Sequence, residues 1–209
     1  MSLFKNYLEL TKPKVVSMML ITAIVGMLLA TPNIPSFQIM IIALLGIGLC
    51  AASAATINQI IDRNIDAGMQ RTSGRPLPQG EVSLVNASLF ALFLMIMGTI
   101  ILIYFVNTLT ALLTICSFIG YAFIYTVFLK RATPQNIVIG GLAGAAPPLL
   151  GWTAITNSID PTAVLLVLIL FVWTPPHFWA LAIYRKDEYA KESIPCLLYT
   201  SPSPRDGTK

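Results

Sequence analysis

Residues 84–129 read LVNASLFALFLMIMGTIILIYFVNTLTALLTICSFIGYAFIYTVFL, a stretch of 46 residues without Asp, Glu, Lys, Arg or His. A membrane-spanning helix needs about 20 mainly apolar residues, because the hydrocarbon core of a bilayer is about 30 Å thick. This stretch is long enough for two such helices, with the polar pair Asn107-Thr108 between them. It therefore predicts two spans, Leu84 to Val106 and Leu109 to Leu129.

Four more apolar segments lie on either side of this stretch. We expect further spans at Val15 to Ala30, Phe37 to Ile61, Ile137 to Ile155 and Ala163 to Ile183. The first of these reaches back through Pro13, since proline suits the first turn of a helix. The composition agrees, with 56% hydrophobic and only 11% charged residues among 209. The sequence predicts an all-α fold, a polytopic membrane helical bundle with six transmembrane helices in a lipid bilayer.

The basic residues indicate how the bundle is oriented. A net charge of +4 could point to nucleic acid, but the Lys and Arg residues are dispersed between apolar runs rather than gathered in a patch, so we expect no nucleic-acid partner. Loops rich in Lys and Arg stay on the cytoplasmic side of a membrane. With the N-terminus inside, all 13 Lys and Arg residues fall on that side. We expect a bacterial-type plasma membrane protein whose N-terminus and active site are cytoplasmic.

Three oxygen-bearing side chains follow one another at the end of the second span. Asn58, Asp62 and Asp66 are four residues apart, and each step of four advances 40° around an α-helix. The three therefore share one helix face. Two carboxylates and an amide suit Mg²⁺, which typically takes one or two carboxylates and completes its coordination with water and substrate phosphate. The spacing predicts a site for magnesium and a diphosphate.

Basic residues at the same membrane face complete this picture. Arg71 and Arg75 follow the acidic residues directly, and Lys130 and Arg131 end the fourth span. Guanidinium groups bind phosphate oxygens in bidentate fashion. We expect these four residues to bind the substrate diphosphate and to stabilise the negative charge that develops as it leaves an allylic carbon.

A purely structural interpretation competes with this one. A single acidic residue at a membrane boundary more often caps a helix or solvates a loop, and Asp62, Arg63 and Asp66 could do so. The regular spacing of three polar groups and the arginines that follow favour a functional site, because acidic residues within membrane segments are usually functional.

The segment from Asn58 to Gly80 resembles the first acidic motif of the intramembrane aromatic prenyltransferases, a family that includes 4-hydroxybenzoate polyprenyltransferases, chlorophyll synthases and heme O synthases. A second segment, residues 173–195, is similar to the heme-directed branch, the protoheme IX farnesyltransferases or heme O synthases; it reads WTPPHFWALAIYRKDEYAKESIP. The opening residues 10–15, LTKPKV, and residues 147–152, PPLLGW, are similar to that branch as well. The resemblance covers residues 1 to about 195.

The resemblance implies roles for individual residues. Asn58, Asp62 and Asp66 match the catalytic motif that binds magnesium diphosphate, and Arg71 and Arg75 match its phosphate-binding extension. The acidic position of the second motif falls on two neighbours, either of which can fill it. That segment also offers three candidates for substrate binding. These further residues are Asp187 and Glu188 for the catalytic position, and His177, Tyr184 and Arg185 for the substrate.

His177 is the only histidine of the chain, and two interpretations of it stay open. Imidazole is a common heme ligand, so His177 could contact heme. It could equally be a boundary residue that donates a hydrogen bond to a carbonyl freed by Pro175 and Pro176.

The resemblance also implies the reaction. A vinyl group of heme B would attack the farnesyl group of farnesyl diphosphate, with Mg²⁺ as cofactor and diphosphate as leaving group. Heme A synthase or a terminal oxidase would use the product. A prenyltransferase acting on a quinone precursor or another aromatic acceptor is the first alternative. A membrane transporter or structural helical module is the second, since intramembrane acids also carry ions.

The resemblance further implies nine helices, of which this chain supplies six. We expect residues 1–195 to form the prenyltransferase domain, truncated at its C-terminal side. We expect residues 196–209, CLLYTSPSPRDGTK, to be a disordered or foreign tail, because they are polar and do not match the family pattern.

Overall fold

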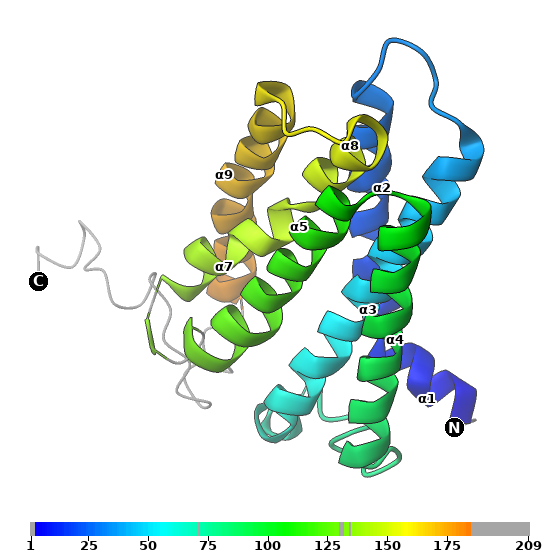
Figure 1. Cartoon of the computed structure of the whole chain (residues 1–209). Coiled ribbons are helices and arrows are strands. Elements are labelled where there is room, and N and C mark those ends of the chain that lie inside the picture. Colours follow the sequence, from blue (N-terminus) through cyan, green and yellow to red (C-terminus); the bar gives the residue numbers. More distant parts are fainter. Residues whose placement is uncertain (1–2, 71, 130–131, 134, 185–209) are drawn as a thin grey trace, which may run out of the picture.

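The structure is a computed structural model of the chain, and it describes residues 3–70, 72–129, 132–133 and 135–184, without the side chains of residues 137, 181, 182 and 184. All regular structure in these ranges is helical (Figure 1). The elements are α1 (Leu3–Leu10), α2 (Pro13–Leu29), α3 (Phe37–Gly68), α4 (Leu84–Phe105), α5 (Thr108–Ile119), the π-helix η1 (Gly120–Leu129), α7 (Asn136–Ala145), α8 (Pro147–Thr156) and α9 (Pro161–Tyr184).

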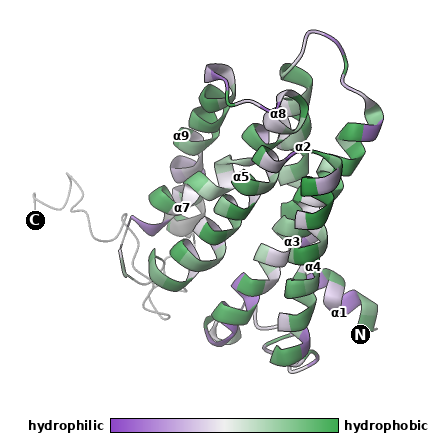
Figure 2. Ribbon diagram, in the orientation of Figure 1, coloured by the Kyte–Doolittle hydropathy of each residue, from purple (hydrophilic) through white to green (hydrophobic). Residues whose placement is uncertain are grey.

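These helices confirm the predicted membrane bundle. Five spans in the described part of the chain are long and apolar enough to cross a bilayer, and the pair α1 and α2, bent by 48°, makes a sixth if it counts as one span. The helix α5 continues into η1 as one span, and α7 continues into α8. Figure 2 shows apolar residues along the middle of the helices and hydrophilic ones mainly near their ends. The chain is an integral membrane protein.

One helix extends further than its apolar length predicts. The helix α2 begins at Pro13, as expected. The helix α3 continues past Ile61, the limit of the predicted apolar span, through Gly68. Its last turns are polar, and a rule based on apolar length alone ends the helix too early there. The extension keeps Asn58, Asp62 and Asp66 within one continuous helix.

Close helix crossings build the half of the bundle nearer the α8–α9 connection. A Cβ atom added at Gly26 of α2 would collide with the carbonyl of Pro148, and one at Gly151 of α8 would collide with the carbonyl of Ala23. The backbones of α2 and α8 are therefore in direct contact, which small residues permit between membrane helices. Gly98 of α4 lies in the same way against the backbone of α3.

The π-helical turn η1 changes which side chains face α3. In a π-helix the backbone hydrogen bonds join residues five apart instead of four. The Thr126 hydroxyl follows this register, since it donates to the carbonyl oxygen of Tyr121 at 2.8 Å. Thr126 is buried, and η1 packs against α3.

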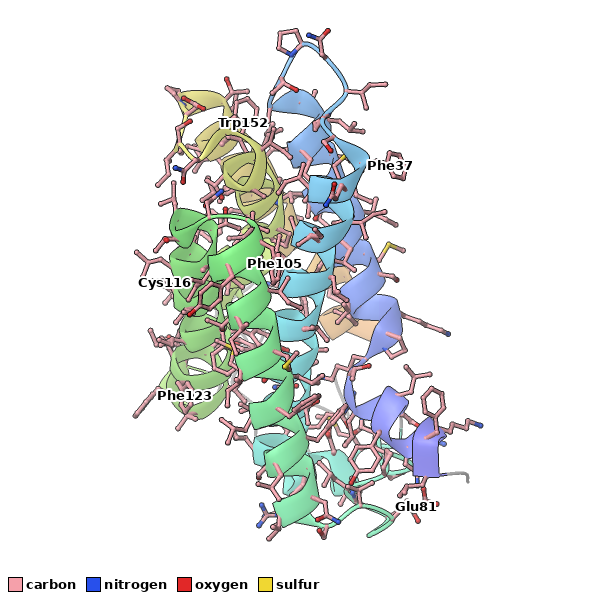
Figure 3. All side chains as sticks on the ribbon, turned by 45° about the vertical axis from the view of Figure 1, so that its right-hand side comes forward. Phe37, Glu81, Phe105, Cys116, Phe123 and Trp152 are labelled. Atoms are coloured by element: carbon pink, nitrogen blue, oxygen red, sulfur yellow. The ribbon has the colours of Figure 1, made fainter. Side chains whose placement is uncertain are left out.

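The connections between the helices lie at two opposite ends of the bundle. The α3–α4 connection lies at the same end as the N-terminus, and the α2–α3 and α8–α9 connections lie at the other (Figure 1). Figure 3 places Glu81 near the first end and Trp152 near the second. At the first end, Leu10 of α1 packs against Leu77, Val82 and Ala87, so that α1 is attached to the α3–α4 connection.

Candidate active site

The three predicted metal ligands lie on one buried face of α3. Their exposed fractions are 5% for Asn58, 4% for Asp62 and 5% for Asp66. Neighbouring residues on the opposite face, Arg63 among them, are exposed. Burial of two carboxylates is unfavourable unless cations or hydrogen-bond donors compensate them. A helix that only solvated a loop would turn these residues outward instead.

Asn58 is the centre of a hydrogen-bonded group. Its amide nitrogen donates to a carboxylate oxygen of Asp62 at 2.9 Å and to the hydroxyl of Thr126 at 3.4 Å. Its amide oxygen accepts from the ammonium of Lys12 at 2.5 Å. Because Lys12 donates to the oxygen while Asp62 and Thr126 accept from the nitrogen, these partners define which way the Asn58 amide group points. α2, α3 and η1 thus meet at one side chain.

Asp66 is paired with the predicted phosphate-binding Arg75. The guanidinium donates to the Asp66 carboxylate at 2.5 Å, and both side chains are largely buried. The hydroxyl of Thr72, itself buried, donates to the Asp66 carbonyl oxygen at 3.0 Å and folds the connection back onto the end of α3. The structure therefore brings Arg75 to the acidic face, as the sequence predicts.

Aromatic side chains of η1 lie beside this polar group. Tyr121 and Tyr125 are stacked, with ring centroids 5.7 Å apart and planes inclined by 19°. Gly140 of α7 makes room for Tyr125, because a Cβ atom there would collide with that ring. The apolar wall next to the acidic residues is thus aromatic.

His177 lies on α9, a helix that carries none of the side chains in the hydrogen-bonded group around Asn58. It is exposed and stacks on Trp173, one turn earlier on α9, with ring centroids 4.4 Å apart. Pro175 and Pro176 lie inside the same helix. Tyr184 is the last residue of α9, and its side chain is not described. The other predicted site residues lie outside the described ranges: Arg71, Lys130, Arg131, Arg185, Asp187 and Glu188.

Two residues of the site were not predicted. The break in the chain at Lys12 could have been found, because a residue before proline avoids the right-handed helical conformation. Its contact with Asn58, 46 positions away in sequence, could not. Thr126 reaches Asn58 only through the π-helical register of η1, for which the sequence carries no known signal.

The donor set fits a hard divalent cation. Asn58, Asp62 and Asp66 offer oxygen atoms only, and Mg²⁺ prefers carboxylate, amide and water oxygens. Within the described ranges, no three His, Cys, Asp or Glu side chains come together to form a metal site. The set that is present, with two carboxylates and an amide, suits a cation that also binds an anionic substrate. Arg75 beside it supplies a positive partner for such an anion.

Comparisons with known proteins agree with this geometry. Residues 19–203 match the model of the UbiA prenyltransferase family. Protoheme IX farnesyltransferase 2 of Pseudoalteromonas atlantica is 60% identical over 194 residues, which are 93% of this chain and 64% of that protein. The protoheme IX farnesyltransferase of Teredinibacter turnerae is 59% identical over 197 residues, or 94% of this chain and 63% of that protein.

Solved structures share the fold. A UbiA homolog from Archaeoglobus fulgidus, solved with DMAPP and Mg²⁺, superposes with a TM-score of 0.76 at 22% identity, over 91% of this chain and 67% of that one. A digeranylgeranylglyceryl phosphate synthase structure gives a TM-score of 0.80 at 22% identity, over 96% of this chain and 70% of that one. The chain spans just under two thirds of the length of the two sequence relatives named above. With a family match over most of its residues, the chain belongs to the UbiA prenyltransferase family.

Proposed function

We propose that the protein transfers a farnesyl group from farnesyl diphosphate to a vinyl group of protoheme IX (heme B), releasing diphosphate and giving heme O. The observation that carries the proposal is the buried row Asn58, Asp62 and Asp66 with Arg75 at its end. Two buried carboxylates are unfavourable in an apolar bundle unless cations compensate them, and a metal bound with diphosphate would supply such a cation. The names of relatives about 60% identical to this chain support farnesyl as donor and protoheme IX as acceptor.

Some site residues would bind the metal ion, and others would bind the diphosphate. Asn58, Asp62 and Asp66 would hold Mg²⁺, and Arg75 would bind the diphosphate with Arg71, Lys130 and Arg131. When bound, Mg²⁺ neutralises the charge that develops on the leaving diphosphate. The described side chains exclude water from this region, because the acidic row is buried. In a site with little water, charge stabilisation by fixed groups is more effective.

The bond changes balance without a redox partner. The carbon–oxygen bond of the allylic diphosphate breaks, and its electron pair leaves with the diphosphate oxygen. The vinyl π electrons of heme form the new carbon–carbon bond to the farnesyl carbon. Water adds to the resulting cation next to the macrocycle and loses a proton, which leaves a hydroxyethylfarnesyl substituent. The stacked Tyr121 and Tyr125 would face the farnesyl chain.

The heme end of the site would lie on α9 and the residues that follow it. His177, Tyr184 and Arg185 are the proposed heme-binding residues, and Asp187 or Glu188 the second acidic position. The exposed stack of His177 on Trp173 offers a flat surface for a macrocycle.

We place the site at the cytoplasmic face of a bacterial plasma membrane, because all 13 Lys and Arg residues fall on that side of the predicted topology. Heme A synthase or a terminal oxidase would use the product.

The test is the heme content of membranes. The gene is expressed in a bacterial host that lacks its own heme O synthase, and extracted heme is analysed by mass spectrometry. We expect heme O with the wild-type protein and heme B alone with Asp62→Asn. Glu81→Gln, an exposed acid at the same end of the bundle, is the matched control and should give heme O.

Two results would contradict the proposal. If the wild-type protein is present in the membrane and the heme stays unmodified, the acceptor is wrong. A prenylated quinone precursor in the same extract would then identify an aromatic acceptor. If Asp62→Asn forms heme O as the wild type does, the acidic row is not the active site.

A further inference from the structure

We infer that Lys12 is a diphosphate-binding residue of this site, presented to the acidic row by a strained break between α1 and α2. The inference rests on the proposed function, because it assigns Lys12 to the same substrate. Three observations carry it: the backbone conformation of Lys12, the contacts that hold the break in place, and the position of its ammonium beside Asn58.

The backbone of Lys12 is in the left-handed region, with φ 50° and ψ 61°. The only other non-glycine residue with positive φ in the described ranges is Asn157, and asparagine tolerates this conformation. Lysine has no such tolerance, and a Cβ atom in this region is strained. Strained residues persist where surrounding contacts hold them, and they concentrate at functional sites. Contacts with surrounding residues must therefore hold the backbone of Lys12 in this left-handed conformation.

The contacts that hold the break come from α3. The amide nitrogen of Gln59 donates to the carbonyl oxygens of Glu9 at 3.1 Å and Leu10 at 3.0 Å. The hydroxyl of Thr56 lies 3.4 Å from the same Leu10 oxygen. Gln59 and Thr56 are fully buried and flank Asn58 on α3. The helix that carries the acidic row thus also fixes the end of α1 and, through it, the backbone of Lys12.

The result is an acidic row with a cation at each end. The Lys12 ammonium meets Asn58 at one end, and the Arg75 guanidinium meets Asp66 at the other. The two cations come from segments that are far apart in sequence. A diphosphate has two phosphoryl groups with negative oxygens, and a pair of cations on either side of its metal matches that charge distribution.

The Lys12 ammonium and a metal ion would compete for the same amide oxygen. Both are cations, so binding of a metal at the Asn58 oxygen repels the ammonium. Lysine has a flexible four-carbon side chain and can move while its backbone stays fixed. A phosphate oxygen of the bound substrate would then accept a hydrogen bond from the ammonium. Asn58 thus keeps the ammonium in reach of the diphosphate, and α1 anchors the lysine from which it extends.

The experiment measures binding of inorganic pyrophosphate with Mg²⁺ to the purified protein in detergent. Lys12→Met removes the charge and keeps the length of the side chain, and we expect roughly 10- to 100-fold weaker binding, the loss typical of one charge-assisted hydrogen bond. Lys14→Met is the matched control, because Lys14 lies two positions further along the chain and is exposed. The pyrophosphate affinity of this variant should stay within about twofold of that of the wild type. Lys12→Arg should restore most of the affinity, since it restores the charge.

A second variant separates substrate binding from folding. Lys12→Gly removes the charge but suits the left-handed conformation. We expect its thermal unfolding temperature to equal or exceed that of wild type, while pyrophosphate affinity falls as in Lys12→Met. Equal pyrophosphate affinity of Lys12→Met and Lys14→Met would overturn the inference. Lys12-dependent pyrophosphate binding without any farnesylation of heme would support the inference and overturn the heme assignment instead.

Discussion

Buried polar side chains occur at both ends of the bundle, and the two groups differ in what they bond to. At the end that holds the α8–α9 connection, Asn107 caps α5 by accepting from the Thr110 backbone nitrogen at 2.8 Å, and it donates to the Thr153 carbonyl oxygen at 2.9 Å. The hydroxyls of Thr110 and Thr153 lie 2.9 Å apart. These neutral groups satisfy helix ends, which a membrane bundle must do internally.

At the other end, four charged side chains take part in bonds between side chains, while Gln59, Thr56 and Thr72 bond to backbone carbonyls. Lys12, Asn58 and Asp62 form one chain of contacts, and Asp66 with Arg75 forms an ion pair. A pair of neutral amides or hydroxyls would fill the same space at lower desolvation cost. Buried polarity alone therefore does not mark a site, whereas a group of buried charged side chains from different segments does.

The largest expected difference in the rate of farnesyl transfer is between two variants that each remove one acidic charge, one at either end of the bundle. Asp62→Asn should lower farnesyl transfer by at least about 100-fold, because an amide cannot replace a carboxylate as metal ligand and charge partner. Asp160→Asn changes an acid whose carboxylate accepts from the Trp152 indole at 2.6 Å and from Ser158 at 2.9 Å. Its transfer rate should stay within about twofold of wild type once the protein is folded. Initial rates with farnesyl diphosphate and heme B measure both.

Equal losses in the two variants would contradict the comparison, since they would make the charge at either end equally important for the reaction. Protein amounts in the membrane must be matched, because Asp160→Asn can reduce folding. Circular dichroism of the purified variants provides that control.

A moderate effect is expected on stability alone. Gly26→Ala places a Cβ atom against the Pro148 carbonyl, so α2 and α8 must separate, at a cost of about 1 to 3 kcal/mol in the free energy of unfolding. Gly144→Ala is the control, because nothing lies within 4 Å of a Cβ atom there. Thermal unfolding in detergent compares them. The expected order is wild type and Gly144→Ala together, with Gly26→Ala below; the reverse order would show that the α2–α8 crossing does not hold the bundle.

The smallest expected differences, in KM and in stability, come from replacing one threonine by valine at either end of the bundle. Thr126→Val removes the hydroxyl that accepts from Asn58, and we expect a rise in KM for farnesyl diphosphate of about two- to fivefold, as for one weak hydrogen bond. Thr110→Val removes a hydroxyl paired with Thr153, and we expect about 1 kcal/mol lower stability without a change in KM. A change in KM for Thr110→Val and none for Thr126→Val would reverse the assignment of the two ends.

The sequence predicts the bundle because apolar length is a local property. Each of the six predicted segments corresponds to a helix or helix pair in the structure. Apolar length ends the second span at Ile61, whereas the spacing of Asn58, Asp62 and Asp66 predicts that the helix goes on through Asp66, and α3 continues to Gly68. The break between α1 and α2 has a local signal, because a residue before proline avoids the right-handed helical conformation. The contacts of Gln59 and Thr56 that hold this break come from α3, far away in sequence.

The site could be predicted in part for the same reason. The spacing of Asn58, Asp62 and Asp66 is helical arithmetic, and the structure confirms that they share a buried face. Arg75 lies close in sequence and pairs with Asp66, and its phosphate-binding role stays a prediction. Lys12 and Thr126 come from distant segments, and only the three-dimensional arrangement brings them to Asn58.

The most direct measurement is the binding of Mn²⁺, which shares the oxygen preference of Mg²⁺ and has an EPR signal in solution that disappears on binding. Mn²⁺ is titrated into the purified protein with pyrophosphate present, for wild type, Asp62→Asn and Asp160→Asn. Because pyrophosphate alone also binds Mn²⁺, the baseline is the same mixture without protein. The account predicts a further loss of the free Mn²⁺ signal with wild type and Asp160→Asn, and no further loss with Asp62→Asn. Equal Mn²⁺ binding by all three proteins would contradict the claim that the buried row on α3 holds the metal and the diphosphate.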